Sequence, residues 1–158
     1  MRSRLARVSL WVVALVAVAA VVAACGGAKA TTESPAVEVP KPSAPGGPGP
    51  AISLTGDVTA GEKVFVDSCK ECHGDNGATG IANPGSDDGT VPNLNPIDPG
   101  LVSADAKTFA TNIDLFIEHG STPAGSNPAK VMTAFGDQGK LTPQQIADVI
   151  AYVISLNK

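Results

Sequence analysis

Apolar residues near the C-terminal end of the chain recur at intervals of three and four positions. Residues 142–145, Thr-Pro-Gln-Gln, fit a capping box with proline at the first helical position. The positions that follow predict a helix whose apolar face consists of Ile146, Val149, Ile150, Val153 and Ile154. We expect this face to be buried against other elements of the fold.

Two further helices are expected upstream. Residues 59–62, Thr-Ala-Gly-Glu, fit a capping box that begins a helix at Thr59 and carries it through Lys70. A second helical pattern covers residues 105–119 and ends at a glycine; its apolar positions are Phe109, Ile113, Phe116 and Ile117. Because the chain has no convincing alternation of apolar and polar residues, the fold is predicted to be all-α.

The first 25 residues have the pattern of an export signal. Three arginines, at positions 2, 4 and 7, precede an apolar run over residues 8–24. The segment Val-Ala-Ala-Cys that ends at Cys25 resembles the bacterial lipoprotein box, in which the cysteine is lipidated and becomes the first mature residue. We therefore interpret residues 1–25 as a lipoprotein-type signal segment. The alternative is an uncleaved transmembrane anchor, for which residues 8–24 are at the short end of the necessary length.

The remaining sequence divides into a linker and one domain. Residues 26–55 are dominated by Gly, Pro, Ala, Ser and Thr, which predicts a disordered linker. Residues 56–158 have ordinary globular composition and a length typical of one domain. From residue 51 onward the chain holds 6 lysines and 13 acidic residues, a net charge of −7. Such an acidic domain is a poor nucleic-acid binder and would attract basic partners.

The segment Cys69-Lys70-Glu71-Cys72-His73 carries the strongest chemical signal. Two thiols three positions apart lie on one face of a helical turn, so both can add to the vinyl groups of one porphyrin. The following histidine is then placed to coordinate the iron. The spacing is that of c-type haem attachment. The alternatives are a zinc site, for which a second pair of ligands is missing, and a redox dithiol, for which no βαβ context is present.

On these residues the chain resembles the class I (monohaem) cytochrome c family over about residues 56–158, as a bacterial lipoprotein-anchored member. The resemblance implies a cytochrome c fold, a small helical domain around one covalent haem c held by Cys69 and Cys72. It also implies that the turn Val-Pro-Asn-Leu at residues 91–94 supports His73 through the backbone carbonyl of Pro92, and that Leu94 packs on the haem.

The resemblance also implies a sixth iron ligand. Met132 is the only methionine outside the signal segment, and Met-Thr-Ala-Phe-Gly at residues 132–136 is similar to the Met-Pro-Ala-Phe-Gly loop of bacterial members. Thr133 stands where the family usually has proline. The alternative to iron ligation is that Met132 only fills space in the core. The rival ligand is His119, which we interpret as a structural surface residue at a helix end.

The family packs its first and last helices closely, with a small residue facing an aromatic one. Gly61, Phe65 and Tyr152 match those positions. Glycine weakens a helix, which is consistent with a place where two backbones approach one another.

These features predict an electron-transfer protein rather than an enzyme. With His73 and Met132 both bound to iron, no coordination site remains open for oxygen or peroxide. We expect a single-electron carrier at the periplasmic face of the cell membrane, held there by a lipid on Cys25. Compatible partners are a quinol-oxidising complex as donor and a terminal oxidase or photosynthetic reaction centre as acceptor. The alternatives are a peroxidase-like haem enzyme or sensor in which Met132 is displaced, and a binding lipoprotein whose haem is merely structural.

Overall fold

Helices provide all the regular structure in the described part of the chain. The computed structural model describes residues 39–158, with the exception of 45 and 79. The signal segment and Cys25 lie outside the described residues, as does the first part of the predicted linker. Within the described part, no helix combines the length and apolarity needed to cross a bilayer.

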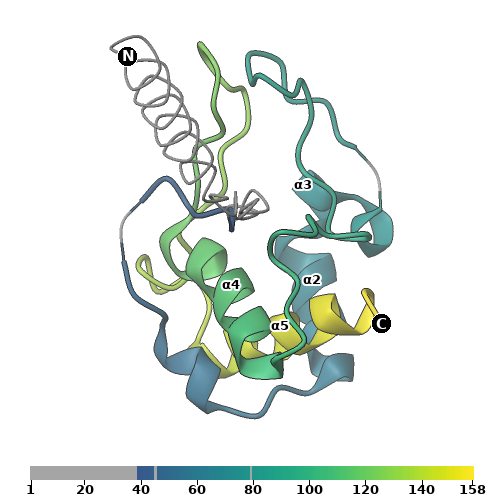
Figure 1. Cartoon of the computed structure of the whole chain (residues 1–158), viewed down its shortest axis with the longest axis vertical. Coiled ribbons are helices and arrows are strands. Elements are labelled where there is room, and N and C mark those ends of the chain that lie inside the picture. The colour runs from purple at the N-terminus through teal and green to yellow at the C-terminus, as the bar shows by residue number, and fades with distance from the viewer. Residues whose placement is uncertain (1–38, 45, 79) are drawn as a thin grey trace, which may run out of the picture. The chain divides into compact units, whose positions relative to one another are not determined.

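Three helices form the body of the domain (Figure 1). They are α2 (Val58–Ser68), α4 (Ala106–His119) and α5 (Pro143–Ser155). Shorter turns flank them: η2 (Pro50–Ser53), α3 (Lys70–His73) and η3 (Asp75–Gly77). Over residues 39–158, apart from the two exceptions, only isolated bridges occur and no strand forms. The all-α prediction is confirmed.

Of the two predicted capping boxes, the one at α5 is present and the one at α2 is not. Thr142 and Gln145 form the predicted capping box of α5, and Asp105 caps α4. At α2 the prediction was wrong, because Asp57 accepts a hydrogen bond from the backbone of Ala60 at 2.8 Å and the helix begins at Val58. The competing cap wins because Asp57 is also fixed by tertiary contact: its own N–H donates to the Asp148 carboxylate at 2.9 Å.

The predicted close crossing of α2 and α5 is present. Gly61 is buried, and a Cβ built on it would overlap the carbonyl oxygen of Asp148 and lie 3.0 Å from the Cβ of Tyr152. The rings of Phe65 and Tyr152 meet with centroids 5.3 Å apart and an interplanar angle of 52°, the tilted arrangement that aromatic pairs favour. The absence of a side chain at residue 61 therefore allows the two helices to touch.

We predict that Gly61→Ala destabilises the protein by about 1–3 kcal/mol, because the added methyl group overpacks the crossing. Helix propensity alone predicts the opposite sign, a gain of roughly 0.5–1 kcal/mol. Denaturant unfolding of the purified haem-loaded protein measures the difference. An unchanged or increased free energy of unfolding would show that the helices do not approach as described.

The described end of the predicted linker packs on the domain instead of remaining free. We call the described residues 40–44 and 46–53 the strap. Ala51 is 1% exposed, and the N–H of Gly49 donates to the buried Asp114 carboxylate at 2.6 Å. Small residues let the strap backbone approach α4: a Cβ at Gly46 or Gly49 would overlap the side chains of His119 or Glu118. The domain therefore begins before residue 56, and the predicted linker boundary is corrected.

His119 is not the surface residue that was predicted. Its side chain is only 10% exposed and lies between the strap and the loop after α4. Nε2 is 2.7 Å from the carbonyl oxygen of Gly47, and Nδ1 is 2.8 Å from the Asp137 carboxylate. Both partners accept hydrogen bonds, so this arrangement favours the protonated imidazole, which can donate from both nitrogens. The hydrogen bond to Asp137, followed by that to Gly47, raises the pKa of His119.

The raised pKa predicts a pH-dependent contribution to stability. This contribution is complete below about pH 6.5, the ordinary pKa of the group, and is lost as pH rises through the higher folded-state pKa. We expect the difference in unfolding free energy between the wild type and His119→Gln to fall by roughly 1 kcal/mol over that interval. Denaturant unfolding at a series of pH values measures it. Parallel pH profiles for the two proteins would contradict the assignment.

Candidate functional site

A cavity of about 700 Å³ lies in the domain, within the size range of small-molecule and cofactor sites. Its walls come from the strap, α2, α3, α4, α5 and the loops that join them. Many of the lining side chains are apolar: Phe65, Val91, Leu94, Ile97, Leu101, Ile113, Phe116, Ile117, Phe135, Val149 and Val153. An apolar space with a few chemically active groups is suited to a large, mostly apolar cofactor.

The two thiols and the histidine of the sequence motif share one wall of this cavity. Cys69 caps the short turn α3, and its carbonyl accepts hydrogen bonds from the N–H groups of Cys72 at 3.1 Å and His73 at 3.0 Å. Both cysteines are free and partly buried. Burial, assisted by the nearby Cys72, raises the pKa of the Cys69 thiol to about 12. A reactive redox dithiol requires a thiolate, which such an environment disfavours.

His73 is oriented by the backbone of a distant turn. Its Nδ1 lies 3.1 Å from the carbonyl oxygen of Pro92. A carbonyl can only accept, so Nδ1 carries the hydrogen and Nε2 keeps a lone pair for a metal. Burial lowers the pKa of His73, against the smaller opposing effect of the Pro92 hydrogen bond. The neutral form that can act as a ligand is therefore favoured.

The turn that supports His73 is itself anchored close to α3. The N–H groups of Leu94 and Asn95 donate to the carbonyl of Gly77 in η3, at 2.8 and 3.1 Å. Leu94 packs against the buried core and lines the cavity. The side chain of Leu94 is thus available to contact a group held beside His73.

Met132 reaches the same cavity from a part of the chain some sixty residues away from the motif. Its backbone exchanges two hydrogen bonds with Ser121, at 2.8 and 3.1 Å, and the N–H of Phe135 donates to Ile117 of α4 at 2.9 Å. These hydrogen bonds lie on both sides of Thr133 and fix the loop. Thr133 occupies the position at which the family usually has proline. His119, the rival ligand, is not among the residues that line the cavity.

Asn83 belongs to the site, although no motif or spacing in the chain predicts it. The loops at residues 80–91 and 121–131, which we call the double loop, lie side by side and extend beyond the helices (Figure 1). Asn83 is fully buried between them: its amide donates to the carbonyl of Lys130 at 2.9 Å and accepts from the N–H of Lys130 at 2.7 Å. The double loop forms one wall of the cavity, so Asn83 supports that wall.

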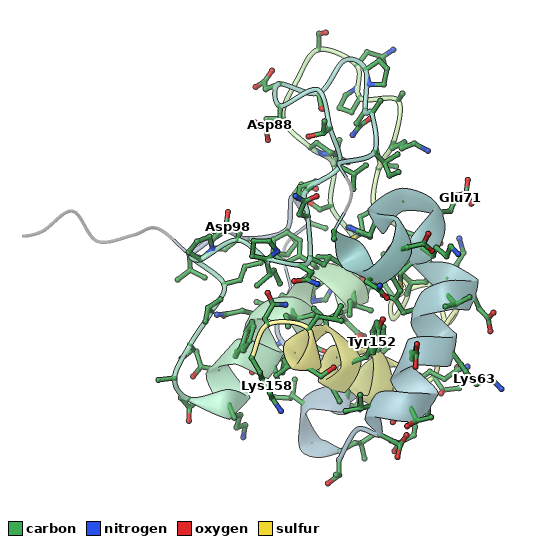
Figure 2. The ribbon with its side chains drawn as sticks, turned by 90° about the vertical axis from the view of Figure 1, so that its right-hand side faces the viewer. Lys63, Glu71, Asp88, Asp98, Tyr152 and Lys158 are labelled. Atoms are coloured by element: carbon green, nitrogen blue, oxygen red, sulfur yellow. The ribbon has the colours of Figure 1, made fainter. Side chains whose placement is uncertain are left out.

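Acidic side chains line part of the cavity at its exposed side. Glu71, Asp88 and Asp98 are exposed and count among its lining residues. Figure 2 shows that these three acidic residues lie on separate segments. Asp88 lies on the double loop in the upper part of the view, far from Lys63 and Tyr152 in the lower part. Lys41 and Lys130 also line the cavity. The three acidic and two basic side chains leave a surplus of one negative charge in the lining of the cavity.

Comparison with known proteins identifies the family to which the chain belongs. The family model for cytochrome c matches residues 58–157, which include every lining residue from Phe65 to Val153. The chain belongs to the cytochrome c family. Membership of this family implies covalently attached haem c and a role in electron transfer.

One relative shares substantial identity with the chain. Over 99 residues the chain is 36% identical to the cbb3-type cytochrome c oxidase subunit CcoP of Rhodobacter capsulatus, a match that covers 63% of this chain. The match spans 29% of that subunit, so most of the relative's sequence lies outside the aligned region. No solved structure matches the chain significantly.

The residues present fit a covalent haem. One cavity of suitable size brings together Cys69, Cys72, His73 and Met132, with Pro92 and Leu94 beside them. Of the predicted site residues, Cys25 alone lies outside the described part of the chain. Within residues 39–158, other than 45 and 79, no group of three or more His, Cys, Asp or Glu side chains could hold a metal ion.

We predict that Asn83→Ala destabilises the haem-loaded protein by about 1–3 kcal/mol, because both backbone groups of Lys130 lose their buried partner. Asn127→Ala provides a matched control, since Asn127 is exposed on the same double loop. Denaturant unfolding should separate the two variants clearly. Equal stabilities would contradict the structural role of Asn83.

Proposed function

We propose that this protein carries single electrons between membrane redox complexes. In this proposal Cys69 and Cys72 hold one haem c through thioether bonds, and His73 and Met132 are its axial ligands. The observation that carries the proposal is the shared cavity, which is lined by all four residues although Met132 is far from the others in sequence. A haem held by these four residues would supply one-electron chemistry between ferrous and ferric iron, with no position left open for a substrate.

The chain's own residues supply orientation and exclusion of water. The Pro92 carbonyl orients the imidazole of His73 and makes it a better donor. The thioether of Met132 is a soft ligand that favours ferrous iron and so raises the reduction potential. Phe65, Ile113 and Val149 belong both to the cavity wall and to the buried core, so this part of the wall is apolar and shielded from solvent.

Surface charge and the relative support the choice of a redox partner, whereas the proposed location rests on the sequence of the first 25 residues. The exposed acidic residues at the cavity favour a basic docking surface on the partner. The relative is by name a subunit of a terminal oxidase, which supports a terminal oxidase as one electron acceptor. A quinol-oxidising complex and a photosynthetic reaction centre are the other partners that we consider. We further propose that lipidation of Cys25 holds the domain at the periplasmic face of the membrane, with residues 26–38 within the tether.

The competing function is a peroxidase-like haem enzyme or a sensor in which Met132 leaves the iron. The two functions differ in whether an external ligand gains access to the iron. Carbon monoxide binding to the reduced protein therefore discriminates between them. Intact mass of the mature protein separately reports the number of haems and any lipid on Cys25.

We predict that the ferric wild type has the weak far-red absorption band of methionine–iron ligation and that the ferrous form does not bind carbon monoxide. Met132→Ala should lose the band, bind carbon monoxide and have a reduction potential lower by roughly 0.1 V or more, within the ~0.8 V range over which haem proteins are tuned. Val66→Ala, at an exposed position of α2 outside the cavity wall, serves as the control. A wild type that binds carbon monoxide readily would favour the enzyme or sensor.

A further inference from the structure

The strap has no part in the function proposed above, yet it reaches the cavity. Pro40, Lys41 and Ser43 are among the lining residues, together with the segment that bears Met132. At its other end the strap is fixed by the burial of Ala51 and by the hydrogen bond from Gly49 to Asp114. A segment that precedes the first long helix is therefore held at both ends, one end at the site and the other on α4.

Ser43 makes the first connection between the strap and Met132. Its hydroxyl accepts a hydrogen bond from the N–H of Thr122 at 2.7 Å, and its own N–H lies 3.4 Å from the hydroxyl of Ser121. Ser121 in turn exchanges two backbone hydrogen bonds with Met132. A continuous series of hydrogen bonds thus runs from the strap to the backbone of the proposed ligand.

His119 makes the second connection, on the other side of Met132. It donates to the strap at Gly47 and to Asp137. The N–H of Asp137 is bound to Glu118 at 3.0 Å, and the N–H of Phe135 is bound to Ile117, so the end of the loop is tied to the end of α4. The imidazole fills the space between strap and loop. A Cβ at Gly46 would overlap its ring, whereas a Cβ at Gly47 would meet nothing within 4 Å.

We propose that the strap holds the Met132 loop closed over the cavity, with Ser43 and His119 as positioning residues for the methionine ligand. The inference rests on the proposed ligation by Met132. Displacement of the strap removes a support on each side of Met132, so the sulfur is exchanged more readily for an external ligand. In that exchange one iron–sulfur bond breaks, one iron–nitrogen bond to the incoming ligand forms, and the oxidation state of the iron does not change.

The test compares two neighbouring glycines in the full-length, haem-loaded ferric protein. Gly46→Ala displaces the His119 ring and breaks its two hydrogen bonds, whereas Gly47→Ala leaves both intact. Imidazole is the probe, and loss of the far-red methionine–iron band reports its binding. We expect Gly46→Ala to bind imidazole about tenfold more tightly than the wild type, as loss of such hydrogen bonds implies. Gly47→Ala should match the wild type.

A second pair of variants keeps the test informative if Gly46→Ala does not fold. His119→Ala removes the same two hydrogen bonds from the domain side and should also bind imidazole more tightly. Asp57→Ala removes the cap of α2, away from the strap, and should lower thermal stability without changing imidazole affinity.

The outcomes separate the inference from the proposed function. A wild type with the far-red band, together with Gly46→Ala and His119→Ala proteins that melt earlier but keep wild-type imidazole affinity, would overturn the inference alone. A wild type without the band would overturn the ligation by Met132 and the inference with it.

Discussion

The apolar cavity is the constraint on which the other parts of the structure depend. Several residues belong to the buried core and at the same time line the cavity: Phe65, Ile97, Leu101, Ile113, Ile117, Val149 and Val153. Each of them therefore belongs to the core packing and also borders the site. Protein interiors are close-packed, so a group that fills this space contributes contacts to every helix of the body. Cofactor binding and folding are therefore expected to be coupled.

The α2–α5 crossing connects this constraint to the chemistry. Gly61 lets α2 approach α5 closely, and Phe65, one turn further along α2, both contacts Tyr152 and lines the cavity. The chain continues from α2 directly into the turn that bears Cys69 and His73. The position of the two thiols is thus set by a backbone contact between the first and last helices rather than by the motif itself.

Polar side chains in irregular segments complete the site. Asn83 joins the two halves of the double loop, while Asp114 and His119 hold the strap. Each of these side chains binds a backbone group of a segment that is far away in the sequence. The walls that the helices do not supply therefore depend on a few buried hydrogen bonds, and such bonds are costly to leave unmade.

The sequence by itself determined the helices, the capping box at Thr142 and the turn that presents Cys69, Cys72 and His73. All of these follow from residues within about four positions of one another, where helical spacing leaves a regular pattern. Resemblance to a family, rather than spacing, pointed to Pro92 and Met132. Their arrival at one cavity is a property of the tertiary structure.

Only the tertiary structure decided the start of α2, the role of the strap and the functions of Asn83 and His119. Asp57 replaces Thr59 as the cap because a side chain 91 positions away fixes it. The glycines that predicted a free linker also permit close packing on α4, and composition alone cannot distinguish the two outcomes. Asn83 and His119 find their partners 47 and 72 positions away. Hydrogen bonds between irregular segments at such separations follow no periodic spacing, so they leave no pattern in the sequence.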